Sequence, residues 1–201
     1  MSKPFRPAKF WPQLLFVVLA LAALSVCAPA IPALAKSPLT QGQAIPDLEL
    51  SMPGQASQAA YLGLKPESGK TFRLSQIKHP WLLIEVFNMY CTICQGEAER
   101  VNQLYEAISQ GPLKDQIAML GIGVGNSPFE VNVFRKRYAV KFPLFADSGF
   151  KAHKSLGEPR TPYFLLVRMR EPKLRIALTN LGPFGEVPKF MIDLQDAMKK
   201  K

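Results

Sequence analysis

The sequence predicts an α/β domain in which a mixed central sheet is flanked by helices. Two nearly continuous apolar runs, at 81–87 and 117–124, are typical of strands buried in a sheet that is covered on both faces. Each run is followed by a segment whose apolar residues recur at helical spacing. Two further apolar segments, at 162–169 and 174–181, are close enough in sequence to pair as a hairpin. Strands that alternate with helices and then form a hairpin indicate a mixed sheet.

The region before the first long strand is expected to add an N-terminal strand extension. The segment "PDLEL" at 46–50 is a short extended piece, and "TFRLSQI" at 71–77 alternates apolar and polar residues. Residues 51–70 contain several glycines and prolines, so we expect them to form a loop.

Helix signals place the remaining elements. The first long helix should begin near Cys91, with Cys94 one turn further on, and end at "QGP", residues 110–112. A second helix should begin behind Ser127, a favourable N-cap residue, with Pro128 at the first helical position. Shorter elements complete the pattern: a strand at 142–147, a helix at 149–157 and a last helix at about 187–198.

The first 35 residues have the composition of a secretory signal peptide. Basic residues precede an uncharged apolar stretch from Leu14 to Ala28, and the small-residue sequence "ALA" follows at 33–35. The apolar stretch is about 15 residues long, shorter than the roughly 20 that span a bilayer. We therefore expect cleavage after Ala35. The same residues also fit an uncleaved membrane anchor, and Cys27 fits a lipoprotein.

Beyond this leader we expect a polar linker at 36–45 and one domain at 46–201, exported to the periplasm or cell envelope. The formal net charge is +10, but the basic residues are spread along the chain without interleaved aromatic residues. Nucleic-acid binding is therefore not expected. Attraction to an acidic partner is compatible with this charge, as is membrane association through an uncleaved N-terminus.

The pair Cys91 and Cys94 is the most informative motif of the chain. Residues three apart share a helix face at a separation close to disulfide range, and disulfides persist in exported proteins. Cys91 lies where a strand ends and a helix begins, and the positive end of the helix dipole stabilises a thiolate there. Cys91 is therefore predicted to be the exposed nucleophile and Cys94 the shielded resolving thiol.

Two segments resemble the thioredoxin superfamily. Residues 81–105 are similar to its active-site segment, a strand followed by C-x-x-C and a helix, and "RTPYFLLV" at 160–167 is similar to its cis-proline and following strand. The layout of about 46–200 resembles the exported TlpA-like and redoxin (AhpC/TSA-like) branch. The resemblance implies a thioredoxin-like fold in which Thr161 and Pro162 lie beside the cysteines and hold an extended peptide. Tyr90, which replaces the usual tryptophan, is expected to contact substrate.

The resemblance also assigns a role to Glu85, which lies six residues before Cys91 where thioredoxins place a buried acid. A carboxyl group desolvated in an apolar strand has a raised pKa and can accept the proton of the resolving thiol. Glu85 could instead point to a polar edge or pair with a lysine.

The flanking residues differ from the usual "WCGPCK" of thioredoxin. The chain has "YCTICQ" at 90–95, and no basic side chain flanks the pair. Glu97 and Glu99 are expected in the first helical turn, where their charges would oppose a thiolate. The motif therefore leaves the direction of electron flow open.

We predict an exported thiol:disulfide oxidoreductase with Cys91, Cys94 and Glu85 as catalytic residues. The resemblance favours a reductant of envelope protein disulfides that is served by an upstream electron donor. No cofactor is expected besides the redox-active disulfide Cys91–Cys94, and no bound metal.

Two alternative functions use the same residues. A peroxiredoxin-like thiol peroxidase needs a hydroxyl group three residues before its cysteine, and Asn88 stands there, although Arg160 could approach the site. The segment "MYCTIC" at 89–94 matches the M-x-C-x-x-C pattern of copper chaperones, and two thiolates suit Cu(I). A purely structural disulfide is disfavoured because so short a loop restrains little chain entropy.

Overall fold

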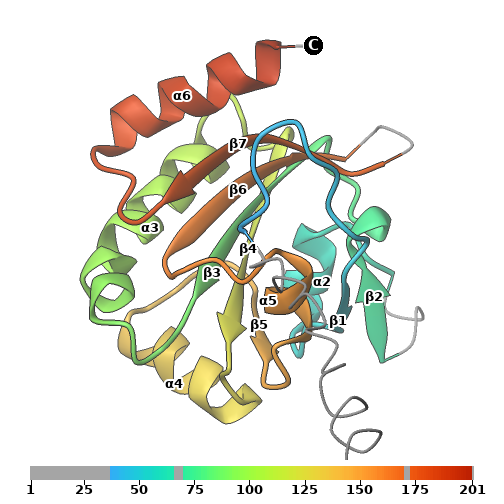
Figure 1. Ribbon diagram of the computed structural model, residues 1–201, viewed down its shortest axis with the longest axis vertical. Coiled ribbons are helices and arrows are strands. Elements are labelled where there is room, and N and C mark those ends of the chain that lie inside the picture. Colours follow the sequence, from blue (N-terminus) through green and yellow to red (C-terminus); the bar gives the residue numbers. More distant parts are fainter. Residues whose placement is uncertain (1–36, 66–69, 170–172, 201) are drawn as a thin grey trace, which may run out of the picture. The chain divides into compact units, whose positions relative to one another are not determined.

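Figure 1 shows a computed structural model of the protein, which describes residues 37–65, 70–169 and 173–200. The predicted leader at 1–35 lies outside the described residues. The described residues form a five-stranded sheet with helices on both of its faces, and a separate two-stranded sheet. The predicted α/β class with a mixed central sheet is confirmed.

The large sheet has the strand order β5-β4-β3-β6-β7. The central strand β3 (Trp81–Phe87) runs parallel to β4 (Ile117–Val124), which in turn runs parallel to β5 (Leu144–Asp147). On the other side, β6 (Tyr163–Arg168) is antiparallel to β3 and pairs with β7 (Arg175–Leu181) as the predicted hairpin. Every residue of β3 and β4 is buried, as their continuous apolar runs predict.

Three long helices cover one face of this sheet: α3 (Thr92–Gln110), α4 (Pro128–Arg137) and α6 (Val187–Lys199). Their buried residues share one apolar cluster with the sheet. The start of α4 is the predicted one, because the Ser127 side chain accepts from the Glu130 amide and the Glu130 carboxylate accepts from the Ser127 amide.

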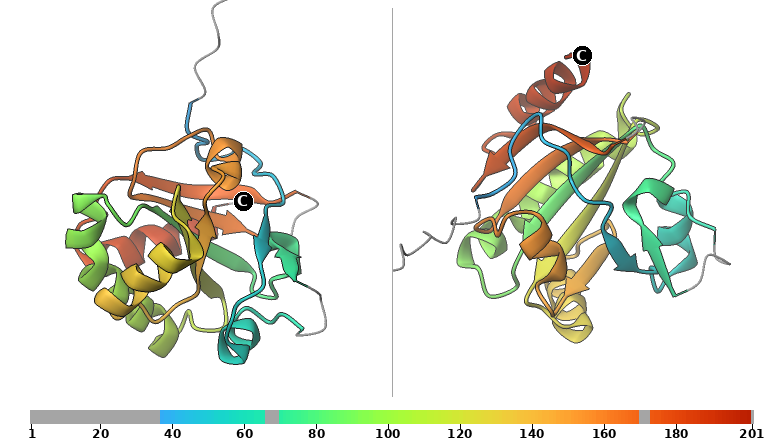
Figure 2. Two further views of the ribbon diagram at one scale, coloured as in Figure 1. Left: turned by 90° about the horizontal axis from the view of Figure 1, so that it is seen from below. Right: turned by 45° about the vertical axis from the view of Figure 1, so that its right-hand side comes forward.

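The other face is covered by smaller elements, which Figure 2 shows on the side opposite α6. They are β1 (Glu49–Ser51), α2 (Ala56–Tyr61), β2 (Thr71–Arg73) and α5 (Lys151–Ser155). The N-terminal strand extension is therefore present, as β1 paired with β2. The prediction of a loop throughout 51–70 is wrong, because α2 lies within it.

The predicted strand at 71–77 is also shorter than expected. The chain turns into a 3-10 helix, η2 (Leu74–Gln76), directly after β2. The Gln76 side chain accepts from the Arg73 amide at 2.7 Å, and the Asp47 carboxylate accepts from the Ser75 amide at 2.9 Å. These side-chain acceptors replace strand pairing, so the extended segment ends at Arg73.

The described part of the segment expected as a free linker, residues 37–45, is bonded to the domain. The Gly42 amide donates to the Ile176 carbonyl of β7 at 2.8 Å, and the Ile45 amide donates to the Leu174 carbonyl at 2.9 Å. Ala44 also forms an isolated bridge with Arg175. This segment therefore lies along the β7 edge of the sheet instead of standing away from it.

Alternation along β3 separates two apolar clusters. Leu82, Ile84 and Val86 face the side of α2, α5 and the small sheet. Leu83 and Phe87 face α3, α4 and α6. Glu85 has the odd-numbered parity of the second group, so it lies on the α3 side of the strand.

Candidate functional site

The loop that follows β3 is fixed by two asparagine side chains. Asn88 Nδ2 donates to the Val124 carbonyl at 2.6 Å, and Asn88 Oδ1 accepts from the Tyr90 amide at 2.8 Å. Asn126 Oδ1 accepts from the Met89 amide at 2.9 Å. These bonds join the carboxyl ends of β3 and β4, so they fix the backbone that carries Cys91.

Cys91 is the N-cap residue of α3, and its sulfur both accepts and donates a hydrogen bond. Cys91 Sγ accepts from the Cys94 amide at 3.2 Å and donates to the Thr161 carbonyl oxygen at 3.4 Å. Partial burial acts to raise the pKa of Cys91. Hydrogen bonds from the Cys94 and Thr161 side chains and from the Cys94 and Ile93 amides outweigh burial, and the pKa falls below its ordinary value.

Cys94 differs from Cys91 in both exposure and acidity. Its side chain is fully buried, whereas Cys91 is partly exposed. Burial raises the pKa of Cys94, and its hydrogen bond with Cys91 raises it further. Both residues are free thiols in this structure. Cys91 is therefore the accessible thiol and Cys94 the shielded one, as predicted.

Thr161 and Pro162 lie where the resemblance places them. The Thr161–Pro162 peptide bond is cis, and β6 begins at the next residue. The Thr161 carbonyl is the group that contacts Cys91 Sγ. The structure thus brings the predicted pair to the thiols, while their contact with a substrate stays a prediction.

Glu85 is buried in the middle of β3, with 2% of its surface exposed. Burial raises the pKa of Glu85 to about 8, and the negative charges of Glu97 and Cys91 act in the same direction. No lysine pairs with it among the described residues, so the alternative of a lysine pair or a polar edge is not what the structure shows. The charge on Cys91 therefore influences the ionisation of this acid.

A second buried acid, Glu97, was not predicted. It lies in α3 with 3% of its surface exposed, and its Oε2 accepts from Arg100 Nη1 at 2.8 Å. Its Oε1 has no hydrogen-bond partner in the described part of the chain. The helix begins at Thr92, so the expectation that Glu97 and Glu99 lie in the first turn is wrong. The only sequence signal was helical spacing after Cys94, which puts Glu97 on the same face as the buried thiol.

An open groove runs past the accessible thiol. It is lined by residues from four separate parts of the chain: Asn88, Tyr90, Cys91, Val124, His153, Pro159, Arg160 and Thr161. Tyr90 is largely exposed, and its hydroxyl donates to the Glu130 carboxylate of α4. On the opposite wall, His153 Nε2 lies 2.9 Å from the Pro159 carbonyl oxygen, which braces the segment before Thr161.

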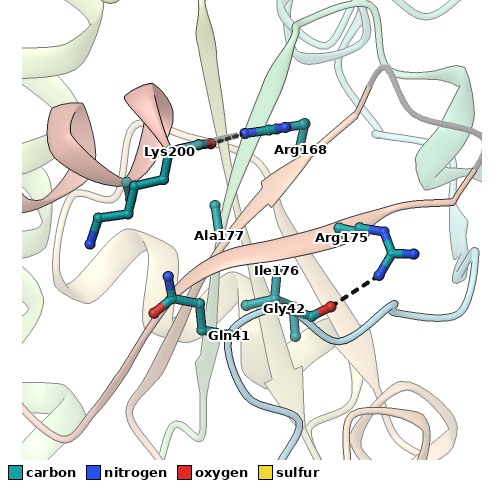
Figure 3. Close-up of a pocket in the computed structure, with 8 residues that line it drawn as sticks. Gln41, Gly42, Arg168, Arg175, Ile176, Ala177 and Lys200 are labelled. Carbon is teal, nitrogen blue, oxygen red and sulfur yellow. Dashed lines mark hydrogen bonds between the residues drawn. The ribbon is translucent and has the colours of Figure 1, made fainter.

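Another hollow lies away from the thiols, between residues 41–42, β7 and the end of α6 (Figure 3). Its two guanidinium groups are bound to the protein itself. Arg175 donates to the Gly42 carbonyl at 3.1 Å, and Arg168 donates to the Lys200 carbonyl and stacks over Trp81, 5.0 Å from the ring centre. These arginines tie chain segments to the sheet and do not converge on a common point.

No helix in the described part of the chain combines the length and the apolar character needed to cross a membrane.

The strand order, the thiol pair at the carboxyl end of β3 and the cis-proline before β6 define a thioredoxin-like fold. The structure is similar to the thioredoxin domain of a thiol-disulfide oxidoreductase from Bacteroides vulgatus, with a TM-score of 0.57 and 12% identity over 78% of this chain and 99% of that one. The sequence of residues 42–174 matches the AhpC/TSA family. The chain belongs to this family, which confirms the predicted resemblance.

Two relatives carry the name thiol-disulfide oxidoreductase ResA. The chain is 23% identical over 122 residues to the protein of Halalkalibacterium halodurans, and 28% identical over 95 residues to that of Bacillus subtilis. The aligned regions cover 60% and 47% of this chain. They span 65% and 50% of the relatives, which is less than two thirds of their length.

Proposed function

We propose that this protein is a thiol-disulfide oxidoreductase whose Cys91 and Cys94 cycle between a dithiol and a disulfide. The observation that carries the proposal is the asymmetry of the pair. Cys91 is accessible and has a lowered pKa, whereas Cys94, three residues later, is buried and has a raised pKa. In such a pair the first thiol ionises more readily and acts as the nucleophile, while the second stays protonated until it is needed. The relatives' name supports the same activity.

The reaction begins with the Cys91 thiolate. It attacks one sulfur of a partner disulfide, forming a mixed disulfide and releasing the other partner sulfur as a thiolate. Cys94 then loses its proton and attacks Cys91 Sγ, which releases the second partner sulfur. Two electrons have then passed from the protein to the partner, whose two sulfurs leave as thiolates and take up protons from the solvent, and Cys91 and Cys94 are joined.

Glu85 is suited to accept the Cys94 proton at the second step. Its pKa of about 8 contains a contribution from the negative charge of Cys91. That charge disappears when Cys91 is joined to a partner, so the pKa of Glu85 falls, although burial and Glu97 still hold it above its ordinary value. The carboxylate form of Glu85 is therefore more populated in the state in which Cys94 must lose its proton.

The proposal also includes the direction of electron flow and the cell compartment in which the protein acts. The leader composition at 1–35 supports export, and the family resemblance supports reduction of protein disulfides in the cell envelope. Tyr90 and Thr161, which line the groove, would contact the partner chain there, together with the adjacent Pro162. An upstream donor would return the disulfide to the dithiol state.

Single serine variants test the mechanism with insulin as the disulfide substrate. Cys91→Ser should reduce turnover to the uncatalysed background, and Cys94→Ser should accumulate a mixed disulfide that gel electrophoresis without reductant detects. Each variant controls for the other, because both remove one thiol from the same site. Full turnover by Cys91→Ser would contradict the mechanism.

The reduction potential of the Cys91–Cys94 pair decides whether the protein reduces or oxidises its partners. Related folds range from about −270 mV for a reductant to about −120 mV for a strong oxidant. A value near the lower end, measured by equilibration with glutathione or dithiothreitol, would support a reductant. Rapid consumption of hydrogen peroxide without insulin reduction would support the thiol peroxidase instead. Stoichiometric Cu(I) capture without thiol turnover would support the metallochaperone.

A further inference from the structure

We propose that Arg160 makes the groove beside Cys91 selective for disulfides that carry a carboxylate next to the reactive cysteine. The inference rests on the proposed thiol exchange at Cys91 and specifies the class of partner that exchanges fastest. The partner segment would contain an aspartate or a glutamate within one or two residues of its cysteine.

The position of Arg160 is the first support. It is exposed and lines the same groove as Cys91. It directly precedes Thr161, whose carbonyl oxygen lies 3.4 Å from Cys91 Sγ. A partner chain whose cysteine reaches Cys91 along this groove therefore passes the guanidinium group within one or two residues.

The second support is that the Arg160 side chain is available. Within the described part of the chain it takes part in no hydrogen bond or ion pair, whereas Arg100 and Arg175 donate to protein oxygens. Arg160 is also absent from the groups that lower the pKa of Cys91, which are donors from Cys94, Thr161 and Ile93. Its charge is therefore used neither for a structural bond nor for activating the thiol.

The third support is the charge of the groove wall. No carboxylate belongs to the groove lining. Glu130 lies behind Tyr90, and its two carboxylate oxygens are occupied by the Tyr90 hydroxyl and by Ser127. A carboxylate entering the groove would thus meet a cation without a competing acid in the wall.

The backbone under Arg160 is held in place, which favours a defined contact. The Asp147 carboxylate accepts from the Ala152 and His153 amides at 3.1 and 2.9 Å. His153 in turn contacts the Pro159 carbonyl at 2.9 Å, one residue before Arg160. A guanidinium group on a fixed backbone can bind a carboxylate through two parallel hydrogen bonds.

The experiment compares peptide disulfides that differ only in charge. The substrates are symmetrical disulfides of two short peptides, one with glutamates and one with glutamines on both sides of a single cysteine. The purified, reduced protein converts each disulfide to two thiols and becomes oxidised at Cys91 and Cys94, so electrons and protons balance. The second-order rate is measured after acid quenching and divided by the rate with dithiothreitol, which removes the intrinsic reactivity of each peptide.

The variants are Arg160→Gln, Arg160→Glu and the control Lys136→Gln. Lys136 is exposed on α4 and does not line the groove, so the control removes the same charge elsewhere. Arg160→Gln should lower the ratio of the glutamate to the glutamine rate by about two- to fivefold, the range of exposed ion pairs. Arg160→Glu should invert the preference. The control should keep the ratio of the parent protein, and 1 M salt should reduce that ratio.

The outcomes separate this inference from the proposed function. If both peptides are reduced and Arg160→Gln leaves the ratio unchanged, the selectivity is overturned while the thiol exchange stands. A fall as large in Lys136→Gln would also overturn it, because overall charge would then be the cause. If neither peptide is reduced, the thiol exchange fails and the selectivity fails with it.

Discussion

The two sides of strand β3 differ in chemistry although they belong to one strand. On the side of α2 and the small sheet, Leu82, Ile84 and Val86 belong to an apolar cluster. On the side of α3, Glu85 replaces an apolar residue and faces the helix that holds Cys94 and Glu97. The first side contributes burial of apolar surface, whereas the second includes a thiol and two acids that are costly to bury.

One side of β3 therefore contributes to the stability of the fold, and the other contributes to the reactivity of the thiols. Apolar burial stabilises the fold, while a buried acid without a cation stays neutral by raising its pKa. The raised pKa makes Glu85 useful as a proton acceptor and makes the fold less stable at high pH. Substitutions on the two sides should therefore change different properties.

The largest effect is expected from Glu85→Gln and depends on pH. In the folded protein the pKa of Glu85 is about 8, against an ordinary value of 4.5. Between these values the unfolded chain releases a proton that the folded chain keeps, so Glu85 makes the parent protein less stable as pH rises. Relative to the parent, the glutamine variant should gain at most about 5 kcal/mol from pH 4.5 to pH 8.

Urea unfolding of the reduced protein at several pH values measures this gain. Glu99→Gln is the control, because Glu99 is an exposed glutamate on α3. Glu85→Gln should also slow resolution of the mixed disulfide, whereas the control should not. Parallel stability curves for the parent and Glu85→Gln would show that Glu85 does not stay protonated in the fold.

A smaller loss of stability is expected from Ile84→Ala on the opposite side of β3. Ile84 is fully buried in the apolar cluster, so its truncation should cost about 3 kcal/mol through lost contacts and a residual cavity. The pKa of Cys91 should not change, since Ile84 points away from the thiols. Thiolate absorbance against pH checks this point, and a shift in that titration would contradict the separation of the two sides.

The smallest effect is expected in the loop that carries Cys91. Asn126→Ala removes the acceptor of the Met89 amide and should cost about 1–2 kcal/mol, because that amide loses its bond. The loosened loop should also raise the pKa of Cys91, which the rate of alkylation by iodoacetamide against pH reports. Asn132→Ala is the control, because Asn132 is a partly exposed asparagine on α4. Equal effects of both variants would remove Asn126 from the support of the site.

Much of the fold was predictable because β3 and β4 are buried on both faces and so read as unbroken apolar runs. Ser127 as N-cap and Pro128 at the first helical position likewise predicted the start of α4. The helix α2 was not predictable, because it is only six residues long and lies in a segment rich in glycine and proline. Local turn signals there are stronger than the weak helical periodicity.

The site residues that could be predicted from spacing are those whose environment is decided by their neighbours in sequence, whereas Thr161 and Pro162 were predicted from the family resemblance. Cys91, Cys94 and Glu85 lie on adjoining elements, so strand and helix geometry brings them together. The contributions of Glu97, Asn126 and Arg160 depend on packing between distant segments. Burial of Glu97 follows from how α3 lies on the sheet, and Asn126 comes from the end of another strand. Spacing along the chain does not contain that information.

The capping of α3 has a consequence for the backbone. One sulfur atom, Cys91 Sγ, is both the proposed attacking group and the acceptor of the Cys94 amide. Each time that sulfur forms a covalent bond, it loses negative charge and becomes a weaker acceptor, so the opening turn of the helix loosens. When the sulfur is released, the turn tightens again. The order of the Cys94 amide therefore depends on whether Cys91 is a free thiolate or is bonded to another sulfur. A partner protein can distinguish these two states by the backbone of this turn alone.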